Sequence, residues 1–393
     1  MKLRVKDIAI YIIGLFIIIS HSMYTYTDDE LFNYIIKVAL SIFPLLYLLF
    51  TMRKLAINRN SLKRLQKYYL VYFLSVLFIA FFDVSGATVN SYIFRFIIFV
   101  PLMVTMFVFD KNSSKIFEAM LNIMIFLSIV SLFFWFFGTN LQLISPTGML
   151  DTTWGGARKV YFGIYSEVGT TIYGGIHRNT SIFGEATVFT YFLGSSLLYE
   201  WFLGKKDKRK LFILISTMIT TFSSSGYLIL LYLVVLWAYQ YMKEHNKFKQ
   251  IKWVVIPIVV VLGVSIVLSL IFDPTKLASV RIRMSDYING FTAWLESPIW
   301  GHGYQLDTTV YNTGFSNSIS LILVNGGIMF LGIYLFPIIK NVKMGVFNSN
   351  KKPFAYFFVG MVLLFGVLIV AYTYHFLMVV AYAYATLIDK RGD

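Results

Sequence analysis

The sequence predicts an all-α integral membrane protein with about twelve transmembrane helices and two long outer loops. Of its 393 residues, 58% are hydrophobic and 13% are charged, and the mean hydropathy is +0.71. The apolar residues form blocks of about 20, which is the length that an α-helix needs to cross the hydrocarbon core of a bilayer. Most of the Lys and Arg residues fall in every second gap between these blocks.

The predicted helices form three groups along the chain. Residues 1–138 hold transmembrane helices 1 to 5, residues 182–272 hold helices 6 to 9, and residues 316–393 hold helices 10 to 12 and a cytoplasmic C-terminus. The two long outer loops are residues 139–181 and 273–315. The twelve apolar segments are centred near Ile17, Phe43, Val76, Ile98, Ile129, Phe192, Ile215, Leu233, Val260, Phe330, Val362 and Met378.

The distribution of positive charge predicts the orientation in the membrane. Of the 34 Lys and Arg residues, 26 lie in one set of alternating gaps or at the termini, and 6 lie in the opposite set. Because cytoplasmic loops carry the excess of Lys and Arg, both termini should be cytoplasmic and both long loops should face outward. The net charge of +15 then reflects topology and attraction to anionic membrane lipid, and no nucleic-acid partner is expected. The absence of Cys excludes disulfides and thiolate chemistry.

Each long loop carries a local structural signal. The first has glycine pairs at 155–156 and 174–175 among aromatic residues, which predicts turns and short extended pieces lying on the helix bundle. The second opens with Asp273 and Pro274, a helix-start pair, and Pro298 should end that helix. Apolar side chains then recur at helical spacing, which predicts an amphipathic helix along the outer interface of the membrane. Those side chains are Met284, Tyr287, Ile288, Phe291 and Leu295.

Cations, aromatic rings and carboxylates occur together in the outer loops. Guanidinium groups bind phosphate oxygens through paired contacts, and aromatic faces stack on the apolar faces of sugars. This combination indicates a lipid-linked phosphosugar as substrate, with anchoring of the same arginines to lipid headgroups as the open alternative. Two further cations, Lys37 and Arg95, lie within predicted helices. An intramembrane cation either marks a polar cavity or extends outward along its own stem, and Arg95 fits both interpretations equally.

Four segments resemble those of bacterial O-antigen and capsular polysaccharide polymerases of the Wzy type. They begin at Arg178, Thr220, Arg283 and Phe315 and read, in that order, RNTSIFGEATVFTYFL, TTFSSSG, RMSDYINGFTAWLESPIWGHGY and FSNSISLILVNGGIMFLG. The order along the chain is that of the family. Each segment is weakly diagnostic by itself, and the combination is more specific.

The resemblance implies the membrane glycosyltransferase (GT-C-like) architecture shared with O-antigen ligases, in the bacterial cytoplasmic membrane. It implies a polymerase that joins repeat units carried on undecaprenyl pyrophosphate into a capsule or O-antigen at the outer face. Neither a metal nor a cofactor is expected, because the lipid pyrophosphate is itself the leaving group. A chain-length regulator and a flippase are the implied protein partners.

Carried over by position, the resemblance assigns roles to particular residues. Arg178 and Arg283 match the arginines expected to hold the pyrophosphate, and Glu185 matches the acidic position after Ile-Phe. The sequence departs from the family pattern at Ala186, where many members have Pro, at His302, which fills the middle of Gly-x-Gly, and at Ser316. Because ligases have His at the position of Ser316, their proposed general base has no counterpart here, which favours a polymerase.

Glu185, His302 and Asp286 are the predicted catalytic candidates for activating the acceptor hydroxyl, with His177 as a further candidate. Each has an ordinary alternative role: Glu185 complements a helix dipole, Asp286 pairs with an Arg on its own helix, and the histidines are polar loop residues. The predicted substrate-binding residues are Arg178, Arg283, Arg158, Arg95, Arg281, His177, Asn317, Trp154 and Tyr304.

Two other functions fit the same composition. An O-antigen-type ligase would transfer a finished glycan to a different acceptor, and a lipid-linked oligosaccharide flippase would also be polytopic with intramembrane cations. Transporters typically show internal repeats and charges near the membrane midplane. The sequence shows neither internal repeats nor carboxylates near the midplane, which favours the polymerase.

Overall fold

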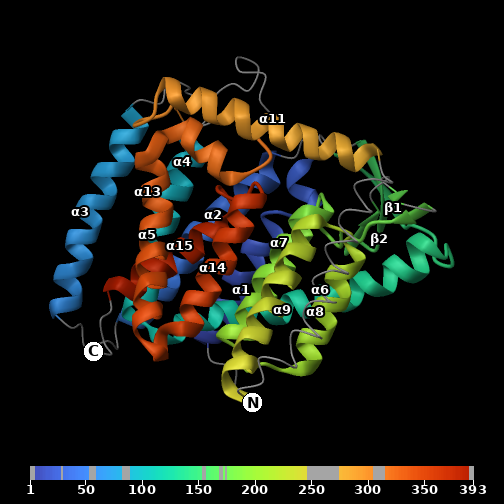
Figure 1. Ribbon diagram of the computed structural model, residues 1–393, viewed down its shortest axis with the longest axis horizontal. Coiled ribbons are helices and arrows are strands. Elements are labelled where there is room, and N and C mark those ends of the chain that lie inside the picture. The colour runs from blue at the N-terminus through green and yellow to red at the C-terminus, as the bar shows by residue number, and fades with distance from the viewer. Residues whose placement is uncertain are drawn as a thin grey trace.

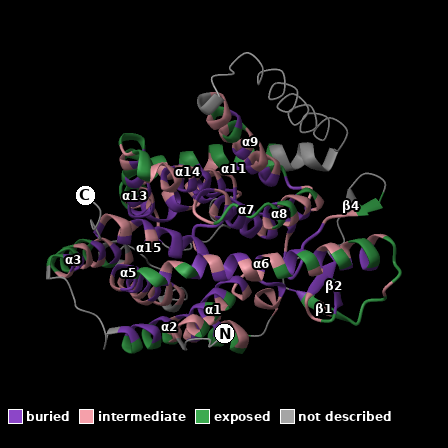
Figure 2. Ribbon diagram, turned by 90° about the horizontal axis from the view of Figure 1, so that it is seen from below, coloured by how far each residue is buried: buried purple, intermediate pink, exposed green. Residues whose placement is uncertain are grey.

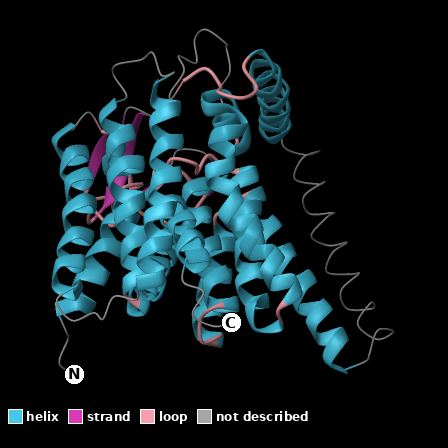
Figure 3. Ribbon diagram, turned by 90° about the vertical axis from the view of Figure 1, so that its left-hand side faces the viewer, coloured by secondary structure: helices cyan, strands magenta, loops and turns pink. Residues whose placement is uncertain are grey.

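The computed structural model describes residues 5–27, 30–52, 59–81, 89–152, 156–167, 171–172, 175–245, 274–303 and 315–388. These residues are mostly helical, and most of the long helices run side by side along a common direction, whereas the helix Pro274–Glu296 lies across one end of the bundle (Figures 1 and 3). The first half contains α1 (Val5–Ile19), η1 (Met23–Tyr26), α2 (Glu30–Met52), α3 (Arg59–Phe81), α4 (Val89–Tyr92), η3 (Ile93–Phe99), α5 (Val100–Phe109), η4 (Lys111–Ser114), α6 (Lys115–Phe133) and η5 (Phe134–Asn140). The second half contains α7 (Ala186–Phe202), α8 (Lys208–Thr220), α9 (Ser224–His245), α11 (Pro274–Glu296), α13 (Ser318–Phe347), η7 (Ser349–Lys351), α14 (Lys352–Val367) and α15 (Tyr374–Ile388).

The helical class of the protein is confirmed. Eleven of the twelve predicted segment centres fall on helices, and the twelfth, Val260, lies outside the described residues. Among the residues that the structure describes, four helices are long and apolar enough to cross a membrane. They cover Glu30–Thr51, Lys111–Asn140, Ser224–Met242 and Ser318–Phe347. The total of twelve spans stays a prediction.

The protein has two distinct ends. α1 begins and α15 ends at one end, and α11 and strands β1 (Gly148–Thr152) and β2 (Gly156–Tyr161) lie at the other (Figure 1). At the first end, Lys6 at the start of α1 pairs with Asp110 after α5 at 3.4 Å. Arg64 near the start of α3 donates a hydrogen bond to the carbonyl of Ile388, the last residue of α15 (3.3 Å). The two predicted long loops therefore share one end of the molecule.

The all-α prediction needs one correction, because the first long loop forms small sheets. β1, β2 and β3 (Tyr165–Glu167) pair antiparallel in that order, and β4 (Thr171–Ile172) pairs with β5 (Ile176–His177). Tyr161 and Tyr165 turn inward onto Phe134 at the end of the preceding helix, with ring centroids 5.7 and 6.0 Å away. The short extended segments predicted for this loop are thus present. The rings of Tyr161 and Tyr165 pack the sheet against the helix bundle.

The core of the protein lies around α15 and α7. Every residue of α15 from His375 to Ala381 is at most 2% exposed, and α7 is buried along most of its length (Figure 2). The peripheral helices α2 and α3 instead expose large apolar side chains, among them Leu31, Phe50, Leu70 and Leu74. Apolar residues on the outer face of a helix are costly in water and favourable in lipid, so this pattern fits a bundle surrounded by bilayer.

Candidate functional site

A cavity of about 840 Å³ lies between the outer-loop elements and the helix bundle. Its wall is built from the segment after α1, the π-helical turn η3, the start of α7, the middle of α11, residues 315 and 316 before α13, and the connection between α14 and α15. Of the predicted site residues it brings together Arg95, Glu185, Arg283 and Asp286. These residues come from three regions of the sequence about 90 residues apart, so only the tertiary fold assembles the site.

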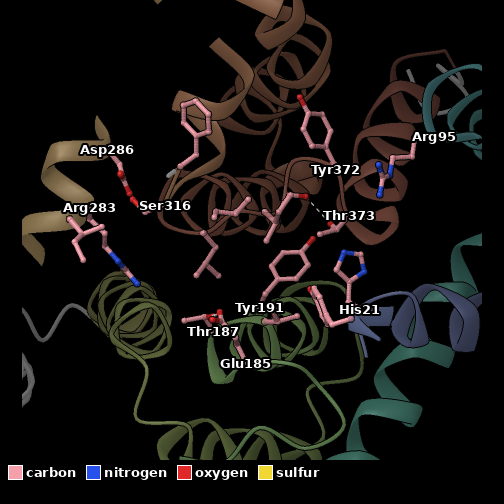
Figure 4. A pocket seen from close by; sticks show the side chains of 17 residues that line it. His21, Arg95, Glu185, Thr187, Tyr191, Arg283, Asp286, Ser316, Tyr372 and Thr373 are labelled. Carbon is pink, nitrogen blue, oxygen red and sulfur yellow. Dashed lines mark hydrogen bonds between the residues drawn. The ribbon is translucent and has the colours of Figure 1, made fainter. Parts of the chain in front are cut away.

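The two arginines of the cavity wall lie on opposite sides (Figure 4). Arg283 and Asp286 come from the same face of α11, and Arg95 reaches the cavity from the other side. The Arg95 guanidinium lies 5.6 Å from the ring centroid of Tyr374, which is a favourable cation–π distance. Of the two interpretations of Arg95, the structure therefore supports the one in which an intramembrane cation lines a polar cavity.

Arg95 lies on a short π-helix, Ile93–Phe99. A π-turn widens the helix by one residue and changes the direction in which side chains point, and such turns are frequent at functional sites. The carbonyl of Arg95 accepts a hydrogen bond from the backbone N–H of Val100, five residues on. The local winding thus helps to aim Arg95 into the cavity.

Glu185 lies on the cavity wall at the start of α7. It occupies the N-cap position in extended conformation, and its Oε2 accepts a hydrogen bond from the hydroxyl of Thr187 (2.6 Å). No side-chain capping bond to the α7 backbone is formed. Glu185 thus lies just before the first turn of α7, where its charge can complement the helix dipole, and its carboxylate also faces the cavity.

Two arginines lie close enough to Glu185 to be affected by its charge. Burial lowers the pKa of Arg178, the charge of Glu185 opposes that shift, and the charge of Arg283 adds to it. Burial also lowers the pKa of Arg158, again opposed by Glu185. Guanidinium groups remain protonated after shifts of this kind. Arg178 and Arg283, which are far apart in sequence, are thus electrostatic neighbours around one carboxylate.

Arg178 does not line the cavity directly. Its Nε donates a hydrogen bond to the carbonyl of Thr221 (3.0 Å), and the next residue, Asn179, bonds to Thr220 through both its backbone N–H and its side chain. The segment from Arg178 is therefore fixed to the turn between α8 and α9. These are two of the four segments that carry the family resemblance, and the fold places them in contact.

The third and fourth of those segments are also in contact. A Cβ atom on Gly290 of α11 would lie 2.8 Å from the Cβ of Ser320 in α13, so α11 rests directly on α13 at this point. After α11, the backbone N–H groups of His302 and Gly303 donate to the carbonyls of Val324 and Asn325 (2.7 and 2.9 Å). The end of the second loop is thereby held against a break in α13.

The amphipathic helix predicted for the second loop is confirmed as α11. It begins at Pro274 and ends at Glu296, two residues before Pro298. Its small and acidic residues Asp286, Gly290 and Ala293 are buried. The predicted apolar stripe is exposed, with values from 39% at Tyr287 to 61% at Met284. The helix therefore turns its polar site face inward and its apolar face away from the protein.

Several predicted site residues lie elsewhere. His302 bonds through Nε2 to the carbonyl of Ala293 (2.8 Å) and does not line the cavity. His177 has its Nδ1 3.9 Å from Glu167, also away from the cavity. Asn317 is the N-cap of α13 and accepts a hydrogen bond from the N–H of Ser320 (2.8 Å), which is an ordinary capping role.

The remaining predicted residues also fall outside the cavity wall. Arg158 is 5% exposed and donates a hydrogen bond to the carbonyl of Gly184, so it supports the backbone beside Glu185. Arg281 is exposed on α11 and does not line the cavity. Trp154 and Tyr304 lie outside the described residues.

Part of the cavity wall was not predicted from the sequence. His21 and Thr373 line it without belonging to any of the four segments, and Tyr191 lines it from within the first segment, where the resemblance assigns it no role. The Tyr191 hydroxyl is hydrogen-bonded to Nδ1 of His375 (2.7 Å), and Nε2 of His375 lies 3.0 Å from the hydroxyl of Ser195. This buried polar chain fixes the phenol of Tyr191 at the cavity floor (Figure 4).

The connection between α14 and α15 forms another unpredicted part of the wall. Residues 368–370 and 372–373 line the cavity. The hydroxyl of Ser318 holds this connection, because it donates to the carbonyl of Leu368 (2.6 Å) and accepts from the N–H of Val370 (2.7 Å). A single serine at the start of α13 therefore shapes the wall opposite Glu185.

Comparison with known proteins does not assign the chain to a family. No model of a protein family matches the chain, and no curated protein matches it.

Proposed function

We propose that the protein is a polysaccharide polymerase that joins lipid-linked oligosaccharide repeat units at the outer face of a bacterial cytoplasmic membrane. The observation that carries this proposal is the cavity of about 840 Å³, which Arg283 and Asp286 line from one side, Arg95 from the opposite side and Glu185 from the start of α7. Its volume suits a substrate of several sugar rings or a pyrophosphate with its first sugar. The resemblance of four sequence segments to Wzy-type polymerases supports the same conclusion.

In the proposed reaction, the guanidinium groups bind the pyrophosphate of the donor. The acceptor hydroxyl oxygen forms a bond to the anomeric carbon of the donor sugar, and the bond from that carbon to the pyrophosphate oxygen breaks. The leaving oxygen takes the electron pair and gains negative charge. Arg283, with Arg178 as its electrostatic neighbour, would stabilise that charge in the transition state, an effect usually worth a few kcal/mol per donor.

A carboxylate would accept the proton of the acceptor hydroxyl. Glu185 is hydrogen-bonded to Thr187 and lies near the buried Arg158 and the half-buried Arg178, so its charge is already engaged. Asp286 is 6% exposed, lines the cavity, and forms no ion pair within the described residues. We therefore assign proton transfer to Asp286 and electrostatic organisation of the arginines to Glu185.

The test compares Arg283→Ala with Arg281→Ala. Both changes remove one guanidinium from α11, but Arg283 lines the cavity and Arg281 is exposed outside it. We expect Arg283→Ala to abolish long glycan chains and to leave a single lipid-linked unit, while Arg281→Ala keeps full-length chains. The glycan is sized by gel electrophoresis, and the amount of protein in the membrane is measured in parallel.

Arg283→Lys separates paired hydrogen bonding from charge alone. An ammonium group cannot make the two parallel contacts of a guanidinium, so we expect little recovery of chain length. Full-length polymer from Arg283→Ala would refute the proposed role of the arginine. Full-length glycan chains from Arg283→Lys would show that a single positive charge at this position suffices for polymerisation.

A further inference from the structure

A second cavity, of about 350 Å³, opens at the other end of the protein, where α1 begins and α15 ends. It lies between α3, α13 and α15, and we call it the basic groove. Its basic residues are Arg64, Lys67 and Lys340, and its apolar residues include Val71, Ile333 and Phe336. It shares no lining residue with the cavity described above.

The charge of the basic groove has one sign. None of the residues that line it is acidic. Within the described part of the chain, the ion pairs do not involve Arg64, Lys67 or Lys340. Arg64 bonds to the carbonyl of Ile388 and the Lys340 ammonium lies 5.5 Å from the ring centroid of Phe336. Three cations without a carboxylate partner complement an anionic group.

The groove is also polar at one end and apolar at the other. On α3, Val71 follows Arg64 by seven residues, and on α13, Ile333 precedes Lys340 by seven residues. Because these two helices run in opposite directions, both pairs place the cation near the end of the bundle and the apolar residue roughly 10 Å deeper. A ligand that fits must therefore carry a negative head and an apolar tail.

One side of the groove is open to the outside of the helix bundle. α3 forms the edge of the molecule beside α13 (Figures 1 and 2). Val71 and Phe336 line the groove and are nevertheless 65% and 56% exposed. Next to them, Leu74 of α3 and Ile339 of α13 are 61% and 59% exposed. An acyl chain would thus continue from the groove onto a surface that already suits lipid.

We propose that the basic groove binds an anionic phospholipid, with the phosphate held by Arg64, Lys67 and Lys340 and one acyl chain along Val71 and Phe336. Basic pockets between transmembrane helices bind anionic headgroups by this chemistry. The bound lipid would connect the edge helix α3 to α13 and α15. It would therefore stabilise the folded protein in proportion to its free concentration and affinity.

The experiment uses the purified full chain in neutral detergent micelles with added dioleoyl phosphatidylglycerol or dioleoyl phosphatidylcholine at equal concentration. Native mass spectrometry counts bound lipid, and a thermal scan gives the apparent unfolding temperature. We expect phosphatidylglycerol to bind and to raise that temperature more than phosphatidylcholine does. The double variant Lys67→Gln and Lys340→Gln should bind phosphatidylglycerol at least about tenfold more weakly.

The matched control is the double variant Lys63→Gln and Lys343→Gln. It removes two exposed cations from the same two helices, but neither residue lines the groove. Retained phosphatidylglycerol binding in the control, together with its loss in the groove variant, supports the site. Equal losses in both variants would reduce the effect to diffuse surface charge and overturn the proposal. An equal shift with soluble glycerol phosphate would also overturn it, because the site would then take a free phosphate.

Discussion

At the scale of single residues, two carboxylates line the main cavity and their surroundings differ. Glu185 lies close to Arg158 and Arg178, whereas Asp286 is buried on α11 without an ion pair among the described residues. The buried arginines need a nearby negative charge, because an uncompensated buried cation is costly. Neutralising Asp286 and neutralising Glu185 should therefore have different effects on activity and stability.

We predict that Asp286→Asn lowers the rate of chain extension by about 100-fold or more, the usual contribution of a general base, and leaves thermal stability nearly unchanged. Glu185→Gln should instead lower the apparent unfolding temperature, because Arg158 and Arg178 lose their compensating charge. Rates are measured with lipid-linked substrate and stability by thermal scan. If Glu185→Gln stopped extension while Asp286→Asn did not, the proton acceptor would be Glu185.

The residues of the site differ in how far they could be predicted from the sequence. Arg178, Arg283 and Glu185 were found through the family resemblance, and Arg95 through the cost of a cation within a helix. His21 carries no comparable local signal, and Tyr191, although it lies in the first of the four segments, is assigned no role by the resemblance. The position of both residues at the cavity depends on how α1 and α7 pack. His302 was predicted as a catalytic candidate with an ordinary polar role as the alternative, and its ring is hydrogen-bonded to the carbonyl of Ala293.

At the scale of elements, the break in α13 explains the glycines of two segments. Gly326 and Gly327 leave the helical conformation, and Gly327 has a φ of +62°. A Cβ on Gly327 would overlap the carbonyl of Ile299, and a Cβ on Gly301, where φ is +71°, would overlap the backbone of Gly326. The Pro-x-x-Gly-x-Gly pattern and the Gly-Gly pair are thus two halves of one backbone contact.

We predict that Gly327→Ala destabilises the protein by about 1–3 kcal/mol, because it combines a strained φ with backbone overlap. Gly332 lies in the same helix and has open space around it, with nothing within 4 Å of an added Cβ. Gly332→Ala should therefore leave stability unchanged or slightly higher, since Ala is the better helix former. Thermal scans of both variants test this, and equal destabilisation would mean that the break in α13 does not depend on Gly327.

The start and end of α11 were predictable, and its contact with α13 was not. Pro274 and Pro298 bound the helix in the sequence because proline suits a first turn and disrupts a helix interior. The apolar stripe was equally visible from its spacing. The contact through Gly290 and Ser320 had no such signal, because a single glycine within a helical pattern does not reveal which partner approaches it.

At the scale of the whole molecule, the charge pattern correctly grouped the two long loops at one end. That success has a physical basis, because Lys and Arg mark every cytoplasmic gap independently of how the helices pack. The arrangement of the helices around α15 could not be derived in the same way. Nearly all helices are apolar on several faces, so hydropathy alone does not say which of them is central. Which end of the protein faces outward stays a prediction from charge.

The absence of Cys makes that orientation directly testable, because a single introduced cysteine is the only reactive thiol. Met149 is 63% exposed in β1, at the end of the molecule where α11 lies. Ser349 is exposed between α13 and α14, at the opposite end of the molecule. We predict that a membrane-impermeant maleimide labels Met149→Cys in intact cells, and labels Ser349→Cys only after the membrane is permeabilised. Labelling is measured by a mass shift on gels, with the unmodified cysteine-free protein as the blank. The reverse pattern would place the main cavity on the cytoplasmic side, where a polymerase of outward-facing lipid-linked glycans has no substrate, and the proposed function would fail.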